Sequence, residues 1–166
     1  NIMELHYGRS SLNIQIPGEY DIICPKEVER IKDIGGELEA CLCRPIGTKP
    51  LKKLVEGKGS VVLLVNDITR PSPLKEILPA VLDHLNDCGI ADGDITVVFG
   101  LGSHRMHTEK EQREVVGSEV FSRVRCIDHD VNRCIDLGKS SYGTPIEIFS
   151  EVVSADVKIC VGSIEY

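Results

Sequence analysis

Short apolar runs recur along most of the chain, and stretches with helical spacing separate them. The runs are rich in Val, Ile and Leu, which is typical of strands buried on both faces of a parallel sheet; they cover 61–66, 94–99, 124–127 and 158–162. Apolar residues spaced for one helix face predict a helix over 73–88; they are Ile77, Leu78, Val81, Leu82 and Leu85. Strands that alternate with helices predict an α/β fold, with a doubly wound, mostly parallel sheet and helices on both faces.

The opening of the chain has a different pattern. Residues 2–7 and 11–16 alternate between apolar and polar side chains, which predicts a small N-terminal β-hairpin that turns at residues 8–10. A third short strand is expected over 20–24, before a proline. This segment is interpreted as a small β element attached to a larger domain.

Two domains are expected. Residues 1–44 would form the N-terminal β element and a connector helix, packed on an α/β domain over 45–166. The chain begins without Met and ends soon after the apolar run 157–161, where a parallel strand would lead into a functional loop. We therefore expect a fragment of a longer protein whose C-terminal domain is absent.

The most informative stretch is the end of the strand at 94–99, which runs into Gly100-Leu101-Gly102-Ser103-His104-Arg105. Glycines let another group approach the main chain closely, and a capping box at 108–111 predicts that a helix follows. Ligands in open α/β sheets bind at the carboxyl ends of strands, so we expect Ser103, His104 and Arg105 at a site. The His104 imidazole could take a proton from a ligand at neutral pH. The alternative is a structural role, in which His104 only makes a hydrogen bond to the backbone.

A second loop, at 66–73, is built in the same way after its own apolar run. It places an acid, a hydroxyl and a guanidinium together as Asp67, Thr69 and Arg70. If the two strands are neighbours, Asp67, Arg70 and His104 face one crevice, where the guanidinium could clamp an anion. The alternatives are a carboxylate that satisfies loop amides and a surface ion pair of small energetic value.

Other polar residues carry weaker signals. His107 lies at a helix entry and is interpreted as solvated. The run Asp128-His129-Asp130 fits either an acid-oriented base or a structural role in fixing its loop. The glycine loop is neither a dinucleotide fingerprint nor a P-loop, so motifs of those classes assign no reaction.

Composition narrows the classes of function. The net charge of -7, the absence of Trp and the 4% aromatic content argue against a nucleic-acid binder. Seven cysteines without a C-x-x-C pair indicate reduced thiols in a cytoplasmic protein. No apolar run approaches the roughly 20 residues that a membrane span needs, and no signal peptide is visible.

The two polar loops resemble signatures of the lactate racemase family, whose members use a nickel-pincer nucleotide. The first signature is Val65-Asn66-Asp67-Ile68-Thr69-Arg70-Pro71 with Leu78-Pro79, and the second is Gly100-Leu101-Gly102-Ser103-His104-Arg105 with Thr108-Glu109. Later landmarks are Asp128-His129-Asp130, Gly138, Gly143-Thr144-Pro145 and Gly162-Ser163-Ile164-Glu165. The likeness keeps its order from about Pro45 to Tyr166.

The resemblance implies the N-terminal catalytic domain of a 2-hydroxyacid (lactate-type) racemase or epimerase. The cofactor would take the α-hydrogen as hydride and return it, and a histidine would accept the hydroxyl proton. His104 matches that histidine, Arg70 matches an arginine that binds the substrate carboxylate or otherwise belongs to the active site, and Asp67 matches an adjacent polar contact to the substrate. The positions expected to contact the cofactor are Thr69, Gly100, Gly102 and Ser103.

The chain also departs from the family pattern. The family's second catalytic histidine, its cofactor-anchoring lysine and its nickel-binding histidine have no match within 1–166, so no metal ligand is assigned and this chain alone is expected to be inactive. Its expected partners are a small 2-hydroxy acid and the C-terminal domain of the same protein. Ser103 stands where threonine is usual, which is a conservative change, whereas Met106-His107 replaces the common Pro-Met and leaves the substrate open. The alternative function is a non-catalytic nucleotide- or anion-binding module on the same fold.

Overall fold

The computed structural model describes residues 2–8, 10–24, 26–70 and 72–163. The chain forms two compact units, Asn1–Arg30 and Ile31–Tyr166. Helix α1 (Ile34–Cys43) belongs to the second unit, because its Leu38 and Leu42 pack against that unit's core. The packing of residues 1–44 on the larger domain stays a prediction.

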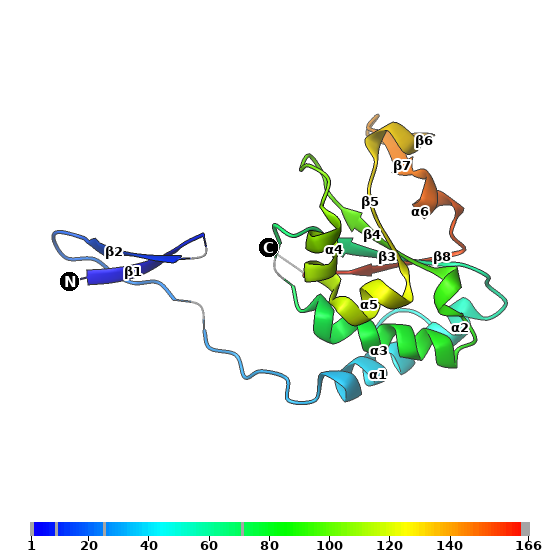
Figure 1. Cartoon of the computed structure of the whole chain (residues 1–166), viewed down its shortest axis with the longest axis horizontal. Helices are drawn as coiled ribbons and strands as arrows, with labels where there is room; N and C mark the ends of the chain where they lie inside the picture. Colours follow the sequence, from blue (N-terminus) through cyan, green and yellow to red (C-terminus); the bar gives the residue numbers. More distant parts are fainter. Residues whose placement is uncertain (1, 9, 25, 71, 164–166) are drawn as a thin grey trace. The chain divides into compact units, whose positions relative to one another are not determined.

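The first unit contains the expected hairpin, drawn in blue in Figure 1. Strands β1 (Ile2–Tyr7) and β2 (Ser10–Gln15) pair antiparallel along their whole length. The strand expected over 20–24 is wrong, because these residues form no strand. Ile22 and Ile23 are 64% and 96% exposed, so their β-branched side chains are not packed as they would be in a sheet.

The second unit is a four-stranded parallel sheet with helices, in the strand order β5-β4-β3-β8. Its strands are β3 (Val61–Asn66), β4 (Ile95–Gly100), β5 (Arg125–Asp128) and β8 (Val157–Val161). Its helices, besides α1, are α2 (Leu51–Val55), α3 (Leu74–Asp87), α4 (Glu109–Val116), α5 (Ser118–Arg123) and α6 (Ser150–Ser154). A second hairpin joins β6 (Cys134–Lys139) to β7 (Pro145–Phe149). The α/β prediction is confirmed.

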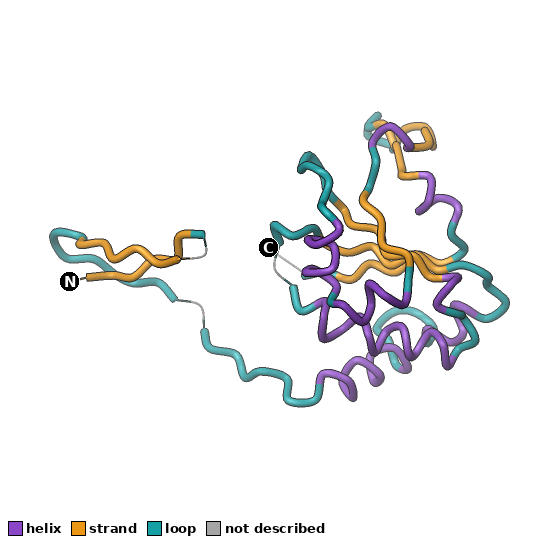
Figure 2. Tube along the Cα trace, in the orientation of Figure 1, coloured by secondary structure: helices purple, strands orange, loops and turns teal. Residues whose placement is uncertain are grey.

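The path of the chain places the connections on both faces of the sheet. From β3 the chain passes through α3 to β4, then through α4 and α5 to β5. It returns through the β6–β7 hairpin and α6 to β8, on the other side of β3. Figure 2 shows the longer helices along one side of the sheet and α6 with the second hairpin on the other. The direction of winding therefore reverses between β3 and β8.

Two apolar clusters pack against the sheet. The larger lies between the sheet and helices α1 to α5 and includes Leu63, Val97 and Phe99, which are fully buried. The smaller covers the opposite face, where Val62 and Val98 meet Phe149 and Ala155 around α6. The β-branched runs of β3 and β4 are therefore strands covered on both faces. The expectation of burial on both faces is wrong for the edge strands, because Arg125 of β5 and Lys158 and Cys160 of β8 are exposed. None of the helices in the described part of the chain is long and apolar enough to cross a membrane.

Candidate functional site

The loops after β3 and β4 lie side by side, because the two strands are parallel neighbours and end together. Asn66 at the end of β3 is opposite Gly100 at the end of β4, which confirms that the two strands are adjacent. The loop after β4 folds into a turn in which the His104 N–H donates to the carbonyl of Leu101 at 3.0 Å. Gly102, inside this turn, has a φ of +56°, a conformation that favours glycine. The glycine thus shapes the turn that carries His104.

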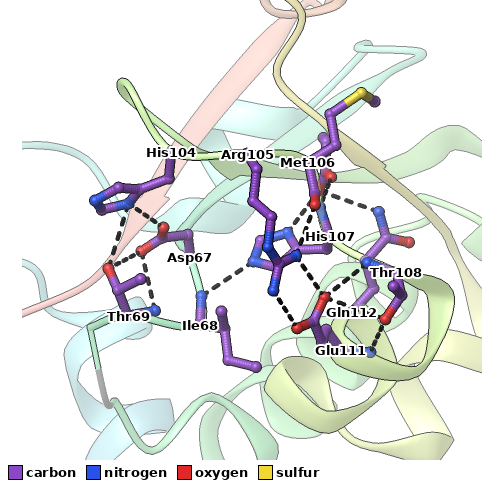
Figure 3. A network of polar contacts seen from close by, with 11 residues as sticks. Asp67, Ile68, Thr69, His104, Arg105, Met106, His107, Thr108, Glu111 and Gln112 are labelled. Carbon is purple, nitrogen blue, oxygen red and sulfur yellow. Dashed lines mark hydrogen bonds and ion pairs between the residues drawn. The ribbon is translucent and has the colours of Figure 1, made fainter.

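Asp67 and His104 form a hydrogen-bonded pair at this edge of the sheet (Figure 3). His104 Nδ1 lies 2.5 Å from Asp67 Oδ2, and the Thr69 hydroxyl donates to Asp67 Oδ1 at 2.7 Å. An ionised carboxylate only accepts hydrogen bonds, so Nδ1 carries the proton of this contact and Nε2 of a neutral ring keeps the lone pair. The pair therefore orients an imidazole whose Nε2 is ready to accept a proton.

The two partners differ in exposure. The Asp67 side chain is 4% exposed, whereas the His104 side chain is 53% exposed. Burial raises the pKa of the Asp67 carboxyl, but hydrogen bonds from Thr69 and His104 and the charge of His104 outweigh it and hold this pKa below its ordinary value of 3.8. An ionised, buried carboxylate behind an accessible imidazole is the arrangement of an oriented general base.

His107 is buried, and the expectation that it is solvated is wrong. Its side chain and that of Asp128 are each 1% exposed, and His107 Nδ1 lies 2.8 Å from Asp128 Oδ1. The Ile68 N–H donates to His107 Nε2 at 3.1 Å, and Gln112 Nε2 donates to Asp128 Oδ1 at 3.1 Å. Sequence reasoning missed this second histidine–carboxylate pair, because Asp128 lies on the next strand of the sheet. The sequence did offer one indication of this pair, because Asp128 lies at the end of a predicted strand.

The remaining residues of the Asp128-His129-Asp130 run have structural contacts. The His129 N–H donates to the Phe99 carbonyl at 3.0 Å, which extends the contact between β4 and β5. The His129 ring lies edge-on to Phe149, with centroids 5.6 Å apart. Asp130 accepts the Asn132 N–H at 2.9 Å in the following turn. Of the two interpretations of this run, the contacts favour the one in which it fixes its loop.

Arg105 anchors the glycine loop to α4. Its guanidinium nitrogens donate to the two carboxylate oxygens of Glu111 at 2.9 and 2.7 Å. Glu111 also accepts the Thr108 N–H at 2.8 Å and completes the expected capping box of α4. The hydrogen bonds from Arg105 hold the pKa of Glu111 far below its usual range. His104 therefore lies between a turn at Gly102 and a residue that is bound to the next helix.

Arg70 does not line the hollow that contains His104. It lines a hollow of about 310 Å³ at the start of α3, together with Ser72, Lys75 and others. His104 lines a separate hollow of about 170 Å³. Asp67 and Ile68 contribute to the walls of both, so the two hollows are neighbours rather than one crevice. The structure therefore brings Asp67 to His104, whereas Arg70 lines the neighbouring hollow.

The four residues expected to contact a cofactor lie around the pair. Thr69 bonds Asp67 directly and lines the hollow of His104. Gly100 ends β4, Gly102 and Ser103 lie in the loop that follows, and all three are exposed. A Cβ at Gly102 would meet no atom within 4 Å, whereas one at Gly100 would lie 3.5 Å from the Val65 carbonyl. The loop is thus open to an approaching group on the side of Gly102.

Comparison with known proteins settles the family. The model of the family described as "Lactate racemase N-terminal domain" matches residues 7–166. The chain belongs to the lactate racemase N-terminal domain family. The resemblance that the two polar loops indicated is therefore confirmed, and it extends further toward the start of the chain than those loops suggested.

Individual members of this family are distant relatives. The lactate racemase of Thermoanaerobacterium thermosaccharolyticum is 29% identical over 170 residues, which are 98% of this chain and 40% of that protein. The lactate racemase of Lactiplantibacillus plantarum is 29% identical over 131 residues, or 77% of this chain and 31% of that protein. The structure of the T. thermosaccharolyticum lactate racemase apoprotein superposes with a TM-score of 0.74 at 27% identity, over 96% of this chain and 38% of that one. The chain thus spans at most about two-fifths of the length of these relatives.

Metal donors are sparse in the described ranges. Among these residues no group of three or more His, Cys, Asp or Glu side chains is placed to hold a metal ion. In each histidine–carboxylate pair, Nδ1 of the histidine is already hydrogen-bonded to an oxygen of the carboxylate. The described residues thus offer an open glycine loop beside His104 and no cluster of metal donors.

Proposed function

We propose that this chain is the N-terminal catalytic domain of a 2-hydroxyacid racemase of the lactate type, and that His104 is its general base. The observation that carries the proposal is the Asp67–His104 pair at the carboxyl edge of the sheet, in a chain that belongs to the lactate racemase N-terminal domain family. Ligands of open α/β sheets bind at this edge. An exposed imidazole there is accessible to a small acid.

The proton chemistry follows from the orientation of the ring. Asp67 Oδ2 accepts from His104 Nδ1 at 2.5 Å, which leaves the Nε2 lone pair for the hydroxyl proton of a 2-hydroxy acid. Both carboxylate oxygens of Asp67 are engaged, one by His104 and one by Thr69. We therefore assign Asp67 to orienting the base, in place of the substrate contact expected from the sequence. When His104 becomes cationic, the buried carboxylate stabilises it.

Arg70 is proposed to bind the substrate carboxylate. A guanidinium matches a carboxylate with two parallel hydrogen bonds. A 2-hydroxy acid carries its carboxylate and hydroxyl on neighbouring carbons, whereas Arg70 and His104 line neighbouring hollows. The proposal therefore requires the Arg70 side chain to turn past Ile68 toward His104 when the acid binds.

A nickel-pincer nucleotide is the proposed cofactor, and it would supply removal and return of the α-hydrogen as hydride. Thr69, Gly100, Gly102 and Ser103 are proposed to contact its organic part. The metal donors would come from the further length that the relatives carry beyond the part matched here. We accordingly propose that residues 1–166 alone do not turn over substrate and that a C-terminal domain completes the site.

The test uses the full-length, cofactor-loaded protein and follows the conversion of one lactate enantiomer into the other by chiral chromatography. We expect His104→Ala to lose most of the activity, since an oriented base contributes roughly 10²–10⁴-fold. His6→Ala is the matched control, because His6 lies in the hairpin of the first unit. Unchanged activity in His104→Ala would remove this residue from the mechanism. Binding of hydroxy acids without any turnover would favour the non-catalytic anion-binding module.

A further inference from the structure

A second, buried histidine lies close to the proposed base in the chain. His107 follows His104 by three residues, yet its side chain is 1% exposed while that of His104 is 53% exposed. Its ring packs edge-on against Phe99, with centroids 5.1 Å apart. Figure 3 shows it between Ile68 and Gln112, and it contributes to the wall of the hollow that contains His104. The proposed chemistry at His104 does not use this residue.

The hydrogen bonds of His107 fix its protonation. The Ile68 N–H can only donate, so Nε2 of His107, at 3.1 Å, must be the acceptor. Nδ1 then carries the ring proton and donates to Asp128 Oδ1 at 2.8 Å. The His107 N–H donates to the other oxygen of Asp128 at 2.6 Å, and Gln112 adds a further hydrogen bond to Oδ1. His107 is therefore a neutral ring with both nitrogens bonded.

This network joins the ends of three strands. Ile68 follows β3, His107 follows β4 and Asp128 ends β5, while Gln112 belongs to α4. Ile68 is the residue directly after Asp67 and shares a planar peptide unit with it. A hydrogen bond that holds the Ile68 N–H therefore also limits how the Asp67 backbone can rotate. The link reaches Asp67 without touching its carboxylate.

We propose that His107 is a positioning residue, which holds the Asp67–Ile68 peptide so that the Asp67 carboxylate meets His104. The effect of His107 on catalysis rests on the proposed function. Its effect on the contact between Asp67 and His104 does not, because that follows from the hydrogen bonds alone. A merely structural histidine would lower the stability of the fold when replaced. A positioning residue must also change the contact between Asp67 and His104, and that change can be measured separately.

The experiment measures the pKa of the Asp67 carboxyl by NMR in the 166-residue chain, from the pH dependence of its ¹³C signal. His107→Phe keeps a ring against Phe99 but removes both nitrogens. His107→Gln can place an acceptor near the position of Nε2, whereas His107→Asn can place a donor near that of Nδ1 and lacks the reach to Ile68. Val120→Ala is the control for lost stability, because Val120 is fully buried in α5, away from the site loops.

We expect the Asp67 pKa of His107→Phe to rise toward 3.8, the ordinary value of the group, as the contact with His104 loosens. His107→Gln should keep the Asp67 pKa low, His107→Asn should raise it, and Val120→Ala should leave it unchanged. A wild-type Asp67 pKa in folded His107→Phe would overturn the proposal. If His107→Phe does not fold, equal Asp67 pKa values in the Gln and Asn variants would overturn it instead. Neither result depends on turnover, so failure here is distinct from failure of the proposed function.

Discussion

Replacing Asp67 with Asn removes the negative charge from the Asp67–His104 pair, which we call the dyad, while keeping the shape of the side chain. Hydrogen bonds to charged groups contribute about 1.5–3 kcal/mol and neutral ones about 0.5–1.5 kcal/mol. The Asp67 side chain is 4% exposed, but its partner His104 is 53% exposed, so solvent screens part of the charge effect. We therefore expect Asp67→Asn to lower the free energy of unfolding by about 1 kcal/mol at pH 7. For a unit of this size, that corresponds to a fall in the melting temperature of roughly 3 °C.

The pH dependence of this loss identifies its cause. The pKa of Asp67 lies below 3.8 in the folded protein, so the stabilisation is complete above pH 3.8 and is lost as the pH falls through the folded-state pKa. Urea unfolding followed by circular dichroism should therefore show a difference between wild type and Asp67→Asn that shrinks below pH 3.8. Asp21→Asn is the control, because it makes the same charge change at an exposed position. A difference that persists at the lowest pH, or none at pH 7, would refute an ionised Asp67 paired with His104.

Two further predictions concern packing beside the site and the helix contacts. Arg123 donates hydrogen bonds to Asp92 at 2.9 Å and to Asp83 and Asn86 of α3. Arg123→Gln should therefore lower the free energy of unfolding, measured by urea titration, by about 1–2 kcal/mol. An unchanged midpoint of unfolding would contradict this. A Cβ at Gly162 would lie 3.2 Å from Asn66 Oδ1, so Gly162→Ala should cost about 1 kcal/mol, whereas Gly93→Ala, with open space around its Cβ, should cost less. Equal melting temperatures for the two glycine variants would show that Asn66 yields without cost.

The sheet and its connections could be predicted because their signals are local. The runs around Val61 to Val65 and Ile95 to Phe99 are long enough and β-branched enough to specify buried strands. The capping box of α4 is a four-residue pattern, and it forms as expected. The strand expected over 20–24 failed because β propensity records packing against neighbouring strands. Its apolar side chains have no such neighbours among the described residues.

The candidate site was predictable in part. The order of β3 and β4 brings Asp67 and His104 to one edge, and the sequence already placed both at strand ends. It could not give the direction in which a loop residue points, and Arg70 lines a different hollow from His104. The burial of His107 depends on Asp128, which lies 21 residues later on another strand. Such pairings are decided by strand order rather than by local composition.

The assignment of a dyad can be tested with a double-mutant cycle in the full-length, cofactor-loaded protein. Lactate racemisation rates are measured for wild type, Asp67→Asn, His104→Ala and the double variant. Residues that act as one unit give losses that do not add. We expect Asp67→Asn to slow the wild type but to have no further effect once His104 is replaced. Equal slowing by Asp67→Asn in both backgrounds would contradict the claim that Asp67 acts through His104.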